Sequence, residues 1–313
     1  MNVFIQGLRR SGTTFLYDIF LEDERFTCYY EPEAAAVTSV GGGSGEHESD
    51  LFDTVRRKRA TFLDRYPEWR EKCPEFMSLN LLNYGAPRLA ELEFEPDLPR
   101  FGYQYLEHLL NGHEHNVLKF TRMYCKPHCL AAVDPQAKFV HIVRDPRFVA
   151  VSYLFGRGRK REKRFWGLDR KLSLKRFFNR RSPHNAWSSL AFSEWILKQP
   201  EYAVTERPTE LGRILILWRY VFEKTDRLGR AAFGDRYILL RHEDLVASPE
   251  PTLRSLYDAI GLPPSEKAMA WMLSHVKQPG PALAEGDPRW REAFEEYGLG
   301  DALRAAGYGS LVG

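Results

Sequence analysis

Residues 2–14, NVFIQGLRRSGTT, decide how the chain begins its fold. The apolar run 2–6 is typical of a short buried strand, and residues 13–21 have the pattern of a helix. The turn between Gly7 and Gly12 therefore directs backbone N–H groups and the positive end of the helix dipole into one small concavity, which suits an anion. The candidate anion-binding residues of this turn are Arg9, Arg10, Ser11, Gly12, Thr13 and Thr14.

The turn has the spacing of an ATPase phosphate loop but lacks its lysine. Where Lys would precede Ser or Thr, this chain has Thr13 followed by Thr14, and positive charge stands earlier, at Arg9 and Arg10. We find no strand that ends in an Asp suited to bind magnesium. The loop therefore favours a phosphate-bearing ligand that is handled without a metal ion.

Further strands are predicted at 26–30, 116–120, 137–143 and 236–241. The run AKFVHIV at 137–143 is almost continuously apolar, as is usual for a central parallel strand buried on both faces. Helices are predicted at 124–133, 147–155, 209–233, 249–260, 264–275 and 288–306, and 51–112 has a mostly helical pattern. This alternation predicts a single three-layer P-loop-like α/β domain over 1–313, with a parallel sheet of about five strands.

Composition excludes several classes of protein. The 313 residues are 43% hydrophobic and 28% charged, as in an ordinary globular protein. No apolar run of about 18 residues is present, so we expect no membrane span. With no basic leader before the first strand we expect a cytoplasmic protein with reduced cysteines. The net charge of +3 is too small to indicate nucleic-acid binding.

Positive charge is concentrated in residues 157–181, which hold twelve Lys and Arg against Glu162 and Asp169. Two interpretations stay open: a lid that attracts an anionic acceptor, or a solvated helical face with a few core aromatics. Cys125, His128 and Cys129 also lie close together in sequence, but a fourth ligand at matching spacing is missing. We therefore predict that they share one helix and bind no metal.

The loop resembles the 5′-phosphosulfate-binding loop of sulfotransferases that use 3′-phosphoadenosine 5′-phosphosulfate (PAPS), often written PRSGTT and here LRRSGTT. Residues 143–153, VRDPRFVAVSY, resemble the family's 3′-phosphate motif, which implies that Arg144 and Ser152 bind that phosphate. Residues 116–153 and 237–262 also resemble the family. The resemblance implies acceptor-specific helical insertions at about 33–115 and 156–235.

The same resemblance assigns roles in catalysis. In the branch similar to protein-tyrosine sulfotransferases, a glutamate base follows the loop arginine by 21 residues, and Glu31 stands 21 residues after Arg10. A lysine that steadies the sulfonate precedes the 3′-phosphate arginine by 25 residues, as Lys119 precedes Arg144. Glu33 is the fallback base. The alternative for Glu31 and for Lys119 is a solvated side chain at the end of a strand, without a catalytic role.

Other features separate the chain from the cytosolic small-molecule branch, which has a histidine two residues after the lysine where this chain has Thr121. The cytosolic branch's C-terminal cofactor loop is not evident either. Lys277, in the stretch VKQP, resembles another cofactor-contacting lysine, and a plain surface lysine is an equal alternative. Arg10 would meet the negative charge that forms on the leaving phosphate.

The sequence therefore predicts a sulfotransferase that moves a sulfonate group from PAPS to a hydroxyl or amine, releases 3′-phosphoadenosine 5′-phosphate (PAP) and needs no metal. The expected acceptor is a small molecule, a glycan or a carrier-bound substrate of anionic character. Two alternatives stay open. One is an atypical P-loop nucleotide or metabolite kinase, which would depend on ATP and magnesium. The other is a non-catalytic nucleotide-binding module.

Overall fold

Five parallel strands form the central sheet of the computed structural model, which describes residues 1–32, 93–155, 178–179, 193–278 and 282–312. The strand order is β2-β3-β1-β4-β5. The strands are β1 (Asn2–Gln6), β2 (Thr27–Tyr30), β3 (Asn116–Phe120), β4 (Lys138–Val143) and β5 (Tyr237–Arg241). Each predicted strand is confirmed to within one residue, because strands buried on both faces leave uninterrupted apolar runs in the sequence.

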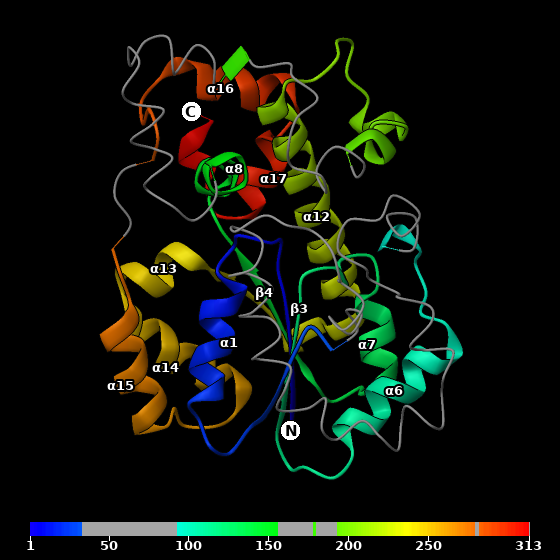
Figure 1. Ribbon diagram of the computed structural model, residues 1–313, viewed down its shortest axis with the longest axis vertical. Helices are drawn as coiled ribbons and strands as arrows, with labels where there is room; N and C mark the ends of the chain where they lie inside the picture. Colours follow the sequence, from blue (N-terminus) through cyan, green and yellow to red (C-terminus); the bar gives the residue numbers. More distant parts are fainter. Residues whose placement is uncertain (33–92, 156–177, 180–192, 279–281, 313) are drawn as a thin grey trace, which may run out of the picture.

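Helices cover both faces of the sheet, as Figure 1 shows. On one face lie α1 (Thr13–Leu21), α13 (His242–Ala247), α14 (Pro249–Ile260) and α15 (Glu266–His275). On the other lie α6 (Arg100–Leu110), α7 (Pro127–Val133) and α12 (Glu210–Phe233). The predicted three-layer α/β fold is therefore confirmed. Sequence analysis did not predict α13, whose six residues are too short for a periodic signal.

A second group of helices lies beyond the carboxyl ends of the strands (Figure 1). It comprises α8 (Pro146–Phe155), α16 (Pro288–Glu296) and α17 (Gly300–Ala305), followed by the 3₁₀ turn Gly309–Leu311. These elements and the first half of α12 share a hydrophobic cluster separate from the cluster around the sheet. Two more 3₁₀ turns, Pro200–Tyr202 and Gly234–Arg236, flank α12.

The prediction of one continuous helix over 288–306 is wrong. The chain leaves the helix at Gly298, whose φ of 65° is left-handed. The next amide, Leu299 N–H, bonds back to Phe294 O at 2.8 Å, and the Gly298 amide bonds to Glu295 O at 3.1 Å. Such a glycine with two backward bonds is a common way to end a helix, and a new helix then begins at Gly300.

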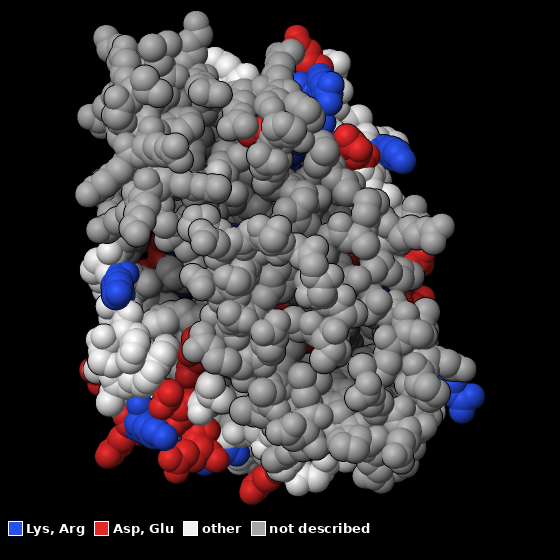
Figure 2. Space-filling model, viewed as in Figure 1, with Lys and Arg blue, Asp and Glu red and all other residues white. Residues whose placement is uncertain are grey.

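Several predictions concern residues that the structure does not describe. They are the fallback base Glu33, the helical pattern over 51–92, and the basic segment 157–181 apart from residues 178–179. Within the described ranges, no helix combines the length and hydropathy needed to cross a bilayer. Figure 2 shows described charges of both signs gathered at the lower left of one face, around α14 and α15. There Lys267 pairs with Glu24 at 3.0 Å and Glu22 at 3.8 Å.

Candidate active site

The loop between β1 and α1, residues 7–14, forms a cradle whose backbone is bent in two places. Arg10 has φ 75° and Gly12 has φ 91°, both left-handed. Alternation of right- and left-handed residues turns successive N–H groups toward one point, where an anion can bind them together. The Ser11 amide bonds to Leu8 O at 3.0 Å and closes the turn. A side chain at Gly7 would collide with the carbonyl oxygen of Ile142, so the cradle lies tightly against β4.

Glu31 and Lys119 meet at the carboxyl edge of the sheet, beside the cradle. Glu31 directly follows β2, and Lys119 lies in the neighbouring strand β3, opposite Tyr30. Lys119 Nζ donates to Glu31 Oε1 at 2.5 Å, and Thr121 Oγ1 donates to the same oxygen at 3.2 Å. The two predicted catalytic side chains therefore contact each other.

This ion pair is almost entirely buried. Lys119 is 1% exposed and Glu31 is 5% exposed. Lys119 Nζ also lies 4.2 Å from the centre of the Tyr30 ring, and the Tyr30 hydroxyl shares a 3.1 Å hydrogen bond with Thr14 Oγ1 of the cradle. Lysine and glutamate are rarely buried unless they are paired. The pair is thus linked through Tyr30 to the predicted phosphate site.

Glu31 has an unusual backbone conformation. Its φ of 45° is left-handed, and its amide bonds to Lys119 O at 2.8 Å. For a residue other than glycine this conformation costs about 1–3 kcal/mol, and such strain is concentrated at functional sites. The bend takes the carboxylate off the line of β2 and holds it over β3.

Arg144 connects the two predicted phosphate motifs. It follows β4, and its Nη1 donates to Arg10 O in the cradle at 3.2 Å. Burial lowers the pKa of Arg144, while the nearby Glu243 and Asp145 oppose this shift. Its Nε atom is buried and has no hydrogen-bond partner among the described residues. A half-buried guanidinium with a donor to spare suits an anionic ligand.

The other predicted cofactor residues are more dispersed. Ser152 is partly buried on α8, the helix that follows Arg144. Ser11 and Thr13 are buried in the cradle, and Lys277 is exposed just after α15. The structure thus places Ser11 and Thr13 in the same loop as Arg10, and it puts Lys277 on the surface.

Sequence analysis missed His242, which packs against the cradle. A side chain on Gly12 would collide with the ring of His242, so the loop passes directly over it. Burial, and next the charge of Arg144, lowers the pKa of His242 to about 4. Its Nδ1 is buried without a hydrogen-bond partner in the described part of the chain. The available signal was a histidine directly after a strand's carboxyl end, where ligands of such sheets bind.

Glu243 joins the end of β4 to the C-terminal part of the chain. Its Oε1 accepts from the Asp145 amide at 3.1 Å, and its Oε2 accepts from the Tyr308 hydroxyl at 2.5 Å. Burial, with the adjacent Glu243, strongly raises the pKa of Tyr308, which stays a neutral donor. Glu243 therefore fixes the backbone next to Arg144.

A second buried polar group follows β3. Arg122 Nη1 lies 3.5 Å from Glu93 Oε2, and the Tyr124 hydroxyl donates to Glu93 Oε1 at 2.9 Å.

Burial raises the pKa of Tyr153 on α8, and the positive charges of Arg9 and Arg10 oppose this shift. Positive charge from the cradle therefore extends toward α8.

Residues 2–170, more than half of the chain, match the model of the Sulfotransferase family. No curated protein sequence matches the chain.

Three solved structures illustrate the similarity. The sulfotransferase domain of the Synechococcus PCC 7002 olefin synthase is 18% identical, over 91% of this chain and 80% of that one, with a TM-score of 0.41. Sulfotransferase STF9 from Mycobacterium avium is 15% identical, over 94% and 76%, with a TM-score of 0.47. Mouse sulfotransferase SULT7A1 complexed with PAP is 11% identical, over 88% and 64%, with a TM-score of 0.37. On the match over residues 2–170, the chain belongs to the sulfotransferase family.

Proposed function

We propose that this sulfotransferase takes the sulfonate group of PAPS, passes it to a hydroxyl or amine of an acceptor, and releases PAP. One observation carries the proposal. Glu31 and Lys119 form a buried ion pair at the carboxyl edge of the sheet, and Tyr30 links the pair to Thr14 of the cradle. A carboxylate and an ammonium beside an anion cradle supply both a base and a cation for group transfer.

The donor would lie along the carboxyl edge of the sheet. The cradle's N–H groups, with the hydroxyls of Ser11, Thr13 and Thr14, would bind the 5′-phosphosulfate. Arg144 and Ser152 would bind the 3′-phosphate. The buried Nε of Arg144, which has no hydrogen-bond partner among the described residues, supports an anion beside it, since buried donors are normally satisfied. The ring of His242 packs against Gly12 of the cradle. We therefore add His242 to the proposed cofactor-binding residues, and Arg9 and Lys277 stay proposed contacts at its margin.

The transfer step follows from these positions. The acceptor oxygen or nitrogen attacks sulfur in line, and the bond between sulfur and the 5′-phosphate oxygen breaks. Glu31 accepts the acceptor's proton, and Lys119 binds the sulfonate oxygens. Arg10 and the cradle meet the charge that forms on the departing phosphate. Lys119 must exchange Glu31 for the sulfonate, which leaves the carboxylate free to accept the proton only when the donor is bound.

The acceptor is proposed to be anionic: a small molecule, a glycan or a carrier-bound substrate. Described residues support this choice, because the charges of Arg9 and Arg10 reach the Tyr153 phenol, whereas the charge of Arg122 is largely balanced by Glu93. Their combined field would attract negative charge to the space between the cradle and α8.

Calorimetric titration with PAP in the absence of metal tests the donor site. We expect tight binding to the unaltered protein and a loss of roughly 10–100-fold with Arg144→Ala, because one or two charge-assisted hydrogen bonds disappear. Arg254→Ala is the matched control, since Arg254 pairs with Glu250 on the exposed surface of α14. Binding of ATP only with magnesium, and none of PAP, would replace the proposal with the kinase alternative.

Release of PAP from PAPS in an acceptor screen tests the base. Glu31→Gln should lower turnover by roughly 10²–10⁴-fold, the usual share of a general base, and leave PAP affinity within a few-fold. Glu114→Gln, at an 88% exposed side chain, should change neither quantity. Unchanged turnover in the Glu31→Gln variant would remove Glu31 from the mechanism, and PAP binding without any turnover would favour a binding module.

A further inference from the structure

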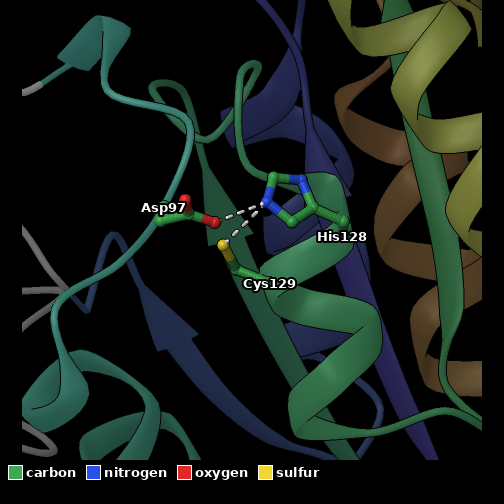
Figure 3. Close-up of side chains that lie close together, drawn as sticks. All are labelled: Asp97, His128 and Cys129. Carbon is green, nitrogen blue, oxygen red and sulfur yellow. Dashed lines mark hydrogen bonds and ion pairs between the residues drawn. The ribbon is translucent and has the colours of Figure 1, made fainter.

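Three side chains of different chemistry meet on the face of the sheet that α6 and α7 cover (Figure 3). His128 and Cys129 lie in the first turn of α7, and Asp97 lies in the segment 93–99 that leads into α6. His128 Nε2 is 3.0 Å from Asp97 Oδ1 and 3.5 Å from Cys129 Sγ. The three ligand atoms all lie within 4.8 Å of one another. In Figure 3 the ring nitrogen of His128 points toward both partners.

We propose that Asp97, His128 and Cys129 bind a zinc ion, with water as the fourth ligand. Zinc lies about 2.0–2.2 Å from nitrogen and oxygen ligands and about 2.3 Å from sulfur, in a tetrahedron. Those lengths place ligand nitrogen and oxygen about 3.4 Å apart, and nitrogen and sulfur about 3.6 Å apart. The observed nitrogen–oxygen and nitrogen–sulfur separations differ from these values by a few tenths of an ångström or less, and the Asp97 oxygen lies within 4.8 Å of the sulfur. A zinc ion therefore requires Asp97 to move outward from His128.

The donor set selects the metal. A thiolate, an imidazole and a carboxylate together suit zinc, whereas magnesium and calcium take oxygen ligands. Exposure of the side chains allows entry, because Asp97 is 71% exposed and His128 is 43% exposed while Cys129 is buried. The ion would thus sit at the surface with its sulfur ligand beneath it.

The sulfur has an outer partner. The Tyr103 hydroxyl, on α6, donates to Cys129 Sγ at 3.2 Å. The Cys129 thiol donates to Pro96 O at 3.6 Å, a bond that a zinc-bound thiolate would give up. A donor to the sulfur stabilises a thiolate and fixes its direction, as outer partners commonly do around bound metals.

The proposed ion would tie α7 to the segment before α6. That segment also holds Glu93, whose carbonyl accepts from Lys126 Nζ at 3.1 Å and whose carboxylate accepts from Tyr124. Zinc would therefore brace this segment against α7. The sequence prediction of no metal considered Cys125, but its Sγ lies 3.5 Å from the Tyr220 hydroxyl. Asp97, 31 residues before His128, takes its place as the third protein ligand.

The test uses metal-free protein titrated with Zn²⁺, followed by Co²⁺ substitution. We expect one equivalent of zinc, and a thiolate-to-cobalt charge-transfer band that Cys129→Ala abolishes and Cys125→Ala, the matched control, retains. His128→Ala changes an exposed side chain and so keeps the fold; it should weaken zinc binding at least tenfold. Tyr103→Phe should weaken zinc binding roughly 10–100-fold, because the hydrogen bond from the Tyr103 hydroxyl to Cys129 Sγ is lost.

The melting temperature gives a readout independent of spectroscopy. Zinc should raise it in the unaltered protein and in Cys125→Ala, and not in His128→Ala or Asp97→Asn, since a ligand that binds only the folded state stabilises it. PAP binding should be the same in all of them, which separates this site from the donor site. Equal zinc affinity in the unaltered protein and His128→Ala, or a cobalt band that survives Cys129→Ala, would overturn the proposal.

Discussion

Removing one partner of the Glu31–Lys119 pair should cost more stability than removing both. At 2.5 Å and an effective dielectric of about 20, the attraction between the charges is about 7 kcal/mol before the cost of burying them is counted. Glu31→Gln leaves a buried ammonium and Lys119→Met leaves a buried carboxylate, so each should lose about 3–5 kcal/mol. The double variant buries no net charge and should lose no more than either single variant.

Urea unfolding of the four proteins measures this cycle. A coupling free energy of at least about 3 kcal/mol is expected between the two sites. Asp301 and Arg304 provide a control cycle, because that pair is 96% and 61% exposed and should couple by no more than about 1 kcal/mol. If the loss of stability in the double variant equals the sum of the two single losses to within about 0.5 kcal/mol, the reasoning is refuted, since independent sites are additive in this way.

Three further outcomes are expected. Folding lowers the pKa of His242 to about 4 from its ordinary value of 6.5, so between these two pH values the unfolded chain binds more protons than the folded one and stability falls as the pH falls. The free energy of unfolding in urea should therefore drop by about 2 kcal/mol less between pH 7 and pH 5 in His242→Gln than in the unaltered protein. Gly12→Ala should abolish PAP binding in calorimetry, whereas Gly112→Ala, at a left-handed glycine in open space, should cost about 1 kcal/mol of stability and leave PAP affinity unchanged. Tyr308→Phe should remove about 1.5–3 kcal/mol in urea unfolding by taking the donor from Glu243, and an unchanged midpoint would contradict a strong bond there.

Much of the fold could be predicted because its signals are local. A strand buried on both faces appears as an apolar run, and the helix start at Thr13 follows from the glycine before it. In parallel sheets, ligands bind at the carboxyl ends of the strands. This places Glu31, Lys119 and Arg144 at one border, since Glu31 and Arg144 directly follow strands and Lys119 is the penultimate residue of β3. What could not be predicted from this rule alone was that Glu31 and Lys119 touch, which depends on β2 and β3 being neighbours.

The remaining parts depend on contacts between residues far apart in sequence. His242 joins the cradle only because β5 lies next to β4 in the sheet, so the residue after β5 reaches Gly12. Asp97 reaches Cys129 only because the segment before α6 passes over α7. In the sequence, Thr121 was of interest only because it occupies the position of the histidine in the cytosolic branch. In the structure its hydroxyl donates a hydrogen bond to Glu31.

The features that lower stability share one location in the described chain, and that coincidence argues for function. Of the three non-glycine residues with left-handed φ there, Arg10 and Glu31 border the site. Lys119 is almost fully buried, and Arg144 holds an unpartnered donor beside Arg10. A sequence selected for stability alone would relax such strain, place an apolar side chain at the buried lysine and pair the guanidinium. In the proposed function these costs have a common purpose: an anion bound at this sheet edge would satisfy the donors, and the strained carboxylate of Glu31 would act as the base.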